Sequence, residues 1–303
     1  MDETFGVRLK EELAGFTANS AWLQFMAKQV LEGFCNGLHR SPHKGSSVAF
    51  KQHRPYVAGD EIRRLDWKVF ARSDRFYIRE YEEETNLRAS LLVDGSGSME
   101  YRGARSTMSK GEYARVLAAI FTQLLIQQQD GVGLVTFDTR VREFIPVRSR
   151  PGHLNVITEA LALASPGGET SLVEVIEEVT RRIAPRGLVV LFSDCFGEVA
   201  ELVRVLGALR HAHHEVVVFQ VMDPDEVDFP FEVWSRFESL EDANDQVNAE
   251  PAAVRRMYLE NVRRFQEELN AGLSRNRVDL VPVTTDTAPS KVFGEFLTRR
   301  MRA

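Results

Sequence analysis

The sequence predicts a doubly wound α/β domain with a mostly parallel sheet, preceded by an N-terminal helical and extended appendage. Three observations favour this fold class. Short apolar runs alternate with helical patterns from residue 89 onward. These runs are continuously apolar, as in strands that helices cover on both faces. The chain of 303 residues is also long enough to bury such a core without disulfides.

Composition excludes several classes of protein. Apolar residues make up 44% of the chain and charged residues 27%, as in an ordinary globular protein. The acidic beginning does not resemble a secretory signal, and no apolar run has the length of a membrane span. The two cysteines, Cys35 and Cys195, cannot form a disulfide framework and fit a reducing compartment. We therefore expect a cytoplasmic protein without membrane insertion.

The appendage is expected to span residues 1–88. Apolar positions at helical spacing between 6 and 37 predict one or two helices. Residues 47–88 mix aromatic residues with glycines and charges, which indicates extended segments and turns. Residues 40–79 hold ten basic side chains against four acidic ones. We interpret them as internally paired rather than as a nucleic-acid surface, because acids are interspersed and the whole chain has a net charge of −6.

The sheet domain is expected to span residues 89–303. Apolar runs predict strands at 89–93, 131–137, 141–147, 188–192, 215–222 and 278–284. Helical patterns lie at 109–129, with Ser109 as the N-cap, and at 152–164, 171–184, 198–211, 252–274 and 290–301. Only three residues separate the second and third strands, too few for a crossover helix. We expect those two strands to pair antiparallel.

Residues 223–250 interrupt this alternation. They hold ten acidic residues against the single Arg236, with aromatic residues among them. The mixture predicts a folded segment, anchored by its aromatic residues, whose carboxylates face solvent. Because it follows the strand at 215–222, it emerges at the sheet edge where binding crevices form. It either borders the binding site and favours a basic partner, or it merely covers one flank of the sheet.

The first strand of the sheet leads into the motif Asp94-Gly-Ser-Gly-Ser98. A carboxylate and two hydroxyls, those of Ser96 and Ser98, follow at intervals of two residues. The glycines between them permit the backbone angles that a tightly curled loop needs. The spacing therefore predicts a loop that gathers three oxygen donors around one point.

Two other loops reach the same edge of the predicted sheet. In the usual doubly wound order the first and fourth strands are neighbours, so Asp94 is expected to lie near Asp194. The loop 166–171 precedes a helix and can deliver a further hydroxyl from Thr170 or Ser171. All these donors are hard oxygens, without histidine or cysteine, and such a set prefers Mg²⁺ or Mn²⁺.

These three motifs closely resemble the von Willebrand factor A fold and its metal-ion-dependent adhesion site. The match consists of Asp-Gly-Ser-Gly-Ser at a strand end, a threonine after Gly-Gly, and Ser-Asp on a later strand. The resemblance implies that Ser96, Ser98 and Thr170 ligate the metal directly. It further implies that Asp94 and Asp194 act on the metal mostly through water.

Further motifs in the chain are the run from Arg54 to Trp67, Ala71-Arg72, Arg79-Glu80, Asp223-Pro224 followed by Phe229-Pro-Phe, and Thr285-Asp286. They resemble the signature of the prokaryotic domain-of-unknown-function family fifty-eight. The resemblance covers residues 30–303 and implies a protein partner, because such proteins tend to be encoded beside MoxR-type AAA+ ATPases and are thought to act with them. Within the first motif, we interpret Arg54, Asp60, Arg64 and Asp66 as a buried ion-pair network that joins the appendage to the sheet, rather than as a binding surface.

Two classes of function are compatible with these motifs. In the first, Mg²⁺ keeps an open coordination position and binds a carboxylate of a partner protein. In the second, a metal-dependent hydrolase or phosphotransferase uses Asp94 and Asp194. An aspartyl-phosphate enzyme would need a second carboxylate where Ser96 stands, and no phosphate loop or serine nucleophile elbow is found. We therefore expect a binding module with no catalytic residues, while a scaffold with an idle metal site stays open.

Overall fold

The computed structural model describes residues 20–37, 49–57, 65–73, 75–82, 87–164, 167, 171–232, 235–238, 240 and 246–302. The chain divides into two compact units. The larger unit comprises Met1–His39 and Leu87–Ala303, and the smaller unit comprises Arg40–Asn86.

The larger unit is built on a six-stranded sheet in the order β10-β7-β6-β3-β4-β5. The strands are β3 (Arg88–Asp94), β4 (Gly131–Phe137), β5 (Val141–Arg148), β6 (Leu188–Ser193), β7 (Glu215–Met222) and β10 (Asp279–Thr284). All neighbours pair parallel except β4 and β5, which pair antiparallel at the edge. The predicted fold class, the adjacency of the first and fourth strands, and the antiparallel pair are confirmed.

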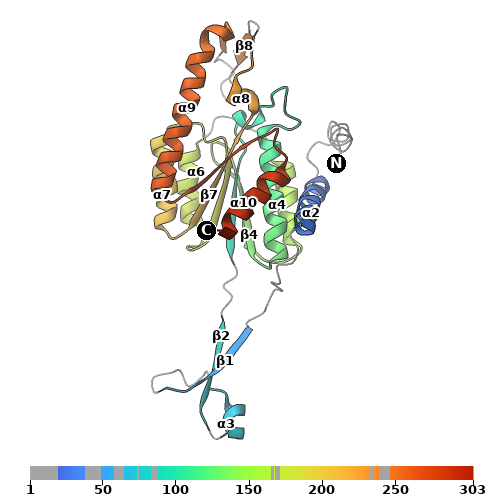
Figure 1. The fold of residues 1–303 in the computed structure, drawn as a ribbon, viewed down its shortest axis with the longest axis vertical. Coiled ribbons are helices and arrows are strands. Elements are labelled where there is room, and N and C mark those ends of the chain that lie inside the picture. The colour runs from blue at the N-terminus through green and yellow to red at the C-terminus, as the bar shows by residue number, and fades with distance from the viewer. Residues whose placement is uncertain are drawn as a thin grey trace. The chain divides into compact units, whose positions relative to one another are not determined.

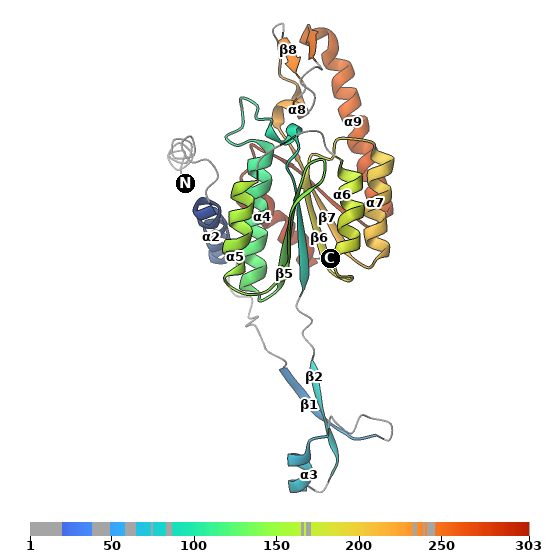
Figure 2. The same ribbon diagram turned by 180° about the vertical axis from the view of Figure 1, so that it is seen from behind.

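Helices cover both faces of this sheet (Figures 1 and 2). One face carries α2 (Ser20–Gly37), α4 (Lys110–Gln127), α5 (His153–Leu163) and α10 (Pro289–Arg302), and the other carries α6 (Leu172–Arg182), α7 (Val199–His211) and α9 (Pro251–Arg275). On the first face the Phe121 ring lies 5.4 Å from Phe219 and 5.1 Å from Phe293, centroid to centroid. In the described part of the chain, no helix is both long and apolar enough to cross a membrane.

Helix α2 belongs to the larger unit, which differs from the predicted boundary at residue 88. Its buried positions Leu23, Ala27 and Leu31 lie four residues apart and therefore share one face of the helix. This face packs against α4 and α5. The Gln24 side chain also donates a hydrogen bond to the Thr158 hydroxyl of α5, at 2.8 Å. Helix α2 and the elements from β3 onward therefore belong to one unit, and residues 40–86 lie between them in the chain.

The smaller unit is a hairpin with one short helix. Strand β1 (Ala49–Pro55) pairs antiparallel with β2 (Tyr77–Glu82), as the extended segments predicted, and α3 (Trp67–Ser73) lies between them in the chain. The rings of Phe70 and Phe76 stack at 4.4 Å.

The predicted ion-pair network of Arg54, Asp60, Arg64 and Asp66 falls only in part on the described residues, because Asp60 and Arg64 lie outside them. Asp66 is buried, and its Oδ1 accepts a hydrogen bond from the Val69 backbone N–H at the start of α3. The Asp66 carboxylate therefore binds the first turn of α3, and the ion-pair network stays a prediction.

The acidic segment after β7 is folded, as expected. It forms α8 (Pro224–Asp228) and an antiparallel hairpin of β8 (Ser235–Glu238) and β9 (Gln246–Ala249), and it leads into α9. Figure 1 shows α8 and β8 beyond the carboxyl end of β7, on the side of the sheet where β3 also ends. The segment therefore reaches the edge at which the predicted site lies.

Candidate functional site

Asp94 ends β3 and is almost completely buried, with 1% of its surface exposed. Its Oδ1 accepts a hydrogen bond from the Ser96 backbone N–H at 2.9 Å, and its Oδ2 accepts one from the Ser193 hydroxyl at 2.6 Å. Burial raises the pKa of Asp94 to about 7, and the nearby carboxylate of Asp194 adds to this shift. The predicted proximity of these two acids is therefore present in the fold.

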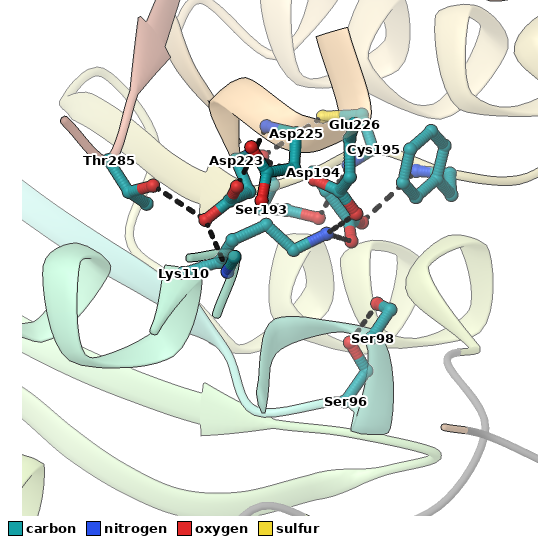
Figure 3. A network of polar contacts seen from close by, with 12 residues as sticks. Ser96, Ser98, Lys110, Ser193, Asp194, Cys195, Asp223, Asp225, Glu226 and Thr285 are labelled. Carbon is teal, nitrogen blue, oxygen red and sulfur yellow. Dashed lines mark hydrogen bonds and ion pairs between the residues drawn. The ribbon is translucent and has the colours of Figure 1, made fainter. Parts of the chain in front are cut away.

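The two hydroxyls of the motif also lie together. Ser96 precedes the short helix η2 (Gly97–Glu100), and its Oγ is 3.1 Å from the Oγ of Ser98 (Figure 3). The loop is fixed from both sides by backbone hydrogen bonds. Gly95 donates to the Phe137 carbonyl at 2.7 Å, and Gly167 donates to the Gly95 carbonyl at 2.9 Å.

A buried lysine, Lys110, is the main component of the site that sequence reasoning missed. Its side chain is 0% exposed, and its ammonium lies 2.9 Å from Asp194 Oδ2 and 2.6 Å from Glu226 Oε1 (Figure 3). The same nitrogen lies over the Phe196 ring, 5.1 Å from its centroid. Burial by itself would lower the pKa of Lys110, but the two carboxylates hold it above its ordinary value. Lys110 thus joins the starts of α4 and α8 to the end of β6.

One local signal could have pointed to Lys110. Ser109 caps α4 with a capping box, which makes Lys110 the first residue of the helix. A cation in the first turn is unfavourable with the helix dipole. A lysine at this position therefore indicates nearby carboxylates, although the sequence does not say which ones.

Helix α8 is fastened to the loop before α4 by two buried acids. Asp223 accepts hydrogen bonds from the Gly103 backbone N–H and from the Thr285 hydroxyl, both at 3.0 Å. Asp225 accepts one from Arg105 Nε at 2.7 Å. The expectation that the carboxylates of the acidic segment face solvent is wrong for these two, since both are buried and paired. Their hydrogen bonds bring α8 to the site.

We expect Gly103→Ala to loosen this attachment. A Cβ built on Gly103 would lie 2.3 Å from carboxylate oxygens of both Asp223 and Asp225. Those side chains are held by several hydrogen bonds and cannot simply turn away, so the free energy of unfolding is expected to fall by about 1–3 kcal/mol. Urea unfolding measures the change. Gly152→Ala is the control, because a Cβ there meets nothing within 4 Å. Equal stability of the two variants would contradict the attachment.

The donors fit a hard divalent cation in part. Asp94, Ser96 and Ser98 offer oxygens from one loop, and two buried acids in proximity favour a cation between or beside them. Asp194 is committed to Lys110, so its carboxylate is not free to ligate a metal in this arrangement. Thr170 lies outside the described residues. Among the described residues, no group of three or more His, Cys, Asp or Glu side chains is placed to hold a metal ion.

Comparison with known families decides the relationship of the chain. Residues 52–268, more than half of the chain, match the family described as "Protein of unknown function DUF58". The chain belongs to this family. The uncharacterized proteins Mb1516 of Mycobacterium bovis and Rv1480 of Mycobacterium tuberculosis are each 29% identical to the DUF58 chain over 211 residues. The match covers 69% of this chain but 65% of theirs, so it spans less than two thirds of the relatives' length.

Solved structures are similar to the DUF58 chain at low sequence identity. The conserved hypothetical protein BatB from Bacteroides thetaiotaomicron has a TM-score of 0.46 and 16% identity, over 71% of this chain and 98% of BatB. The SpRpn10 VWA domain has a TM-score of 0.41 and 10% identity, over 68% of this chain and 94% of that domain. These likenesses concern the fold alone.

Proposed function

We propose that this DUF58 chain is a protein-binding module that binds a carboxylate of its partner through Mg²⁺. The observation that carries the proposal is the loop in which the buried Asp94 precedes two hydroxyls, those of Ser96 and Ser98, only 3.1 Å apart. In this proposal the two serines hold the ion and Asp94 balances its charge. The bound Mg²⁺ supplies a coordination position that an incoming carboxylate fills. The family resemblance adds Thr170 as a direct ligand and Asp194 as a residue that acts on the metal through water.

The hydrogen bonds of the two acids favour binding over catalysis. Both oxygens of Asp94 accept hydrogen bonds within the fold, and Asp194 pairs with Lys110. A nucleophile or general base must also reach a substrate, and the two acids are only 1% and 2% exposed. The donors of this site are instead arranged to hold a charge in place. We therefore propose no catalytic residues, and no observation favours the alternative of a hydrolase or phosphotransferase.

A MoxR-type AAA+ ATPase is the partner that the family resemblance implies, and we include it in the proposal. The acidic segment that begins with α8 borders the site, since Glu226 and Asp194 share the Lys110 ammonium. A segment in this position can contribute to the choice of partner through its charge. A basic surface on the partner is the expected complement.

Titration with Mg²⁺ tests the metal part of this proposal. We expect saturable chemical-shift changes at the amides of residues 94–99 of the full chain, and none at 279–284, because β10 lies three strands away from β3. The affinity of the chain for Mg²⁺ without a partner protein is expected to be weak, because Mg²⁺ gives up its water reluctantly and the site has few charged side chains. A flat titration at residues 94–99 with both Mg²⁺ and Mn²⁺ at millimolar concentration would refute the metal site.

A pull-down from the native host then tests the partner part, with and without Mg²⁺. Capture of a MoxR-type ATPase that a chelator abolishes would agree with the proposal. Capture that is indifferent to the chelator would assign the interaction to another surface.

A further inference from the structure

A cavity of about 580 Å³ adjoins the Asp94 loop within the larger unit. Its walls come from the ends of β3 and β4, from β5, and from the facing sides of α4 and α5. The volume lies in the range of sites that hold a ligand group. Asp94 and Gly95 line the cavity and Ser96 and Ser98 do not, so the cavity adjoins the proposed metal site and shares Asp94 with it.

Part of the inner wall of the cavity is apolar. Met99 and Ile145 line this part and are buried in the core cluster on the α4 and α5 side of the sheet. At the mouth, Val156 and Leu163 of α5 are 48% and 80% exposed. Large apolar side chains exposed beside a cavity are typical of an interaction site. The shape and lining therefore suit an apolar group that enters from outside.

One polar group in the wall lacks a partner. Arg115 lines the cavity, and its Nε is buried without a hydrogen-bond partner among the described residues. Another guanidinium nitrogen of Arg115, Nη1, donates to the Ala164 carbonyl at 3.3 Å, so the side chain is held in place. An unsatisfied buried donor is costly, and an incoming acceptor would remove that cost. A backbone carbonyl of a bound peptide is such an acceptor.

The charges around the cavity are acidic in sum. Asp138 and Arg142 neutralise each other through contacts of 2.6–2.7 Å. The remaining charged residues of the lining are Arg115, the buried Asp94, and the three exposed acids Glu100, Glu143 and Glu159. Three exposed carboxylates near the cavity attract basic groups and repel acidic ones.

We propose that the cavity receives an apolar side chain of an extended partner peptide that carries basic residues on both sides. The apolar side chain fills the space beside Met99 and Ile145, and the adjacent peptide carbonyl accepts a hydrogen bond from Arg115 Nε. The basic residues lie near the acids at the mouth. This inference rests on the proposed function in one respect, that the partner is a protein. The residues that contact the peptide are different from those that hold the metal.

Three short peptides test the proposal on the full chain. The first has a leucine between two pairs of lysines, the second replaces the leucine with serine, and the third replaces the lysines with glutamates. We expect the first to shift the methyl resonances of Val156 and Leu163 saturably, with at least about tenfold tighter binding than the serine peptide, because a leucine side chain is buried. Equal binding of the leucine and serine peptides would overturn the proposal. Preference for the glutamate peptide would overturn it too, since Arg115 would then recognise an acid.

Variants of the cavity sharpen this test. Ala160→Trp places a large ring in the cavity, which Ala160 lines, and is expected to abolish binding of the leucine peptide. Leu163→Ser is a second variant whose folding is not in question, because Leu163 is 80% exposed, and it is expected to weaken binding several-fold. Met257→Trp, at an exposed apolar position of α9, is the matched control and should bind normally. Unaltered binding by both cavity variants would overturn the assignment of the site.

The metal dependence separates this proposal from the proposed function. Binding of the leucine peptide is expected to persist in a chelator, because neither Ser96 nor Ser98 lines the cavity and the peptide contacts Arg115 and the apolar wall rather than the metal. Peptide binding together with a flat Mg²⁺ titration would refute the metal site alone. A normal Mg²⁺ response without peptide binding would refute the cavity proposal alone.

Discussion

Replacing Lys110 with methionine is expected to lower the free energy of unfolding by about 3–5 kcal/mol, the usual effect of removing one partner from a buried ion pair. Methionine preserves the volume of the lysine stem, so the loss comes from the charge. Without the ammonium, Asp194 and the mostly buried Glu226 face each other with no cation between them. Chemical denaturation of the variant and the parent protein measures the difference.

Lys28→Met is the matched control for this experiment. Lys28 also pairs with a glutamate, Glu32, but at 3.8 Å and with both side chains more than half exposed. Exposed pairs of this kind contribute about 0.2–1 kcal/mol. A Lys110→Met variant that loses no more stability than Lys28→Met would show that the buried lysine is not required to balance the two acids.

A saturating divalent cation adds a second readout to the Lys110 variant. If the metal binds beside Asp94, its charge lies close to Asp194 as well, because the two acids interact in the fold. We expect Mg²⁺ to restore part of the lost stability of Lys110→Met and to stabilise the parent protein less, through binding to the native state. Equal stabilisation of both proteins would indicate that Lys110 and the metal do not share Asp194.

The proximity of Asp94 and Asp194 could be predicted because it depends on topology. Strand–helix alternation with apolar strands leaves few ways to wind a sheet, and the usual order makes the first and fourth strands neighbours. Each acid ends or follows its strand, so β3 and β6 carry the two residues to the same edge. Local patterns therefore sufficed to bring together two residues that lie one hundred positions apart in the chain.

The role of Lys110 could not be predicted in the same way. Its contact with Glu226 joins residues 116 positions apart, and one of them lies in an insertion that no winding rule places. The packing of α2 on α4 and α5 was missed for a related reason. The apolar face of α2 shows that another part of the protein must cover this helix, but the sequence pattern does not identify that part. The pattern of a helix or strand does not say which insertion or distant segment of the chain packs against it, because such contacts depend on tertiary packing alone.

Asp94→Asn is expected to weaken Mg²⁺ binding by about 10–100-fold while the fold stays intact. The magnitude is that seen when a carboxylate acting on a metal through an intermediate group is removed. Asparagine has the shape of aspartate, and its oxygen can still accept the hydrogen bond from the Ser96 backbone N–H. Titration of Mg²⁺ against the amides of residues 94–99 measures the affinity. Asp279→Asn, an exposed acid at the start of β10, is the control and should titrate like the parent protein.

The stability of Asp94→Asn provides an independent test of the charge at this position. In the metal-free protein the pKa of Asp94 is about 7, well above its ordinary 3.8, because burial and Asp194 disfavour the carboxylate. The folded state therefore binds a proton more tightly than the unfolded state, and the contribution of Asp94 to stability falls as the pH rises from about 4 to 7. Asparagine does not ionise, so the stability of the variant relative to the parent protein should rise over this pH interval. The variant should keep this higher relative stability at higher pH. If the variant is less stable than the parent protein at pH 8 without metal, the Asp94 carboxylate stabilises the fold. That result would contradict the proposal that Asp94 provides a negative charge for a bound cation.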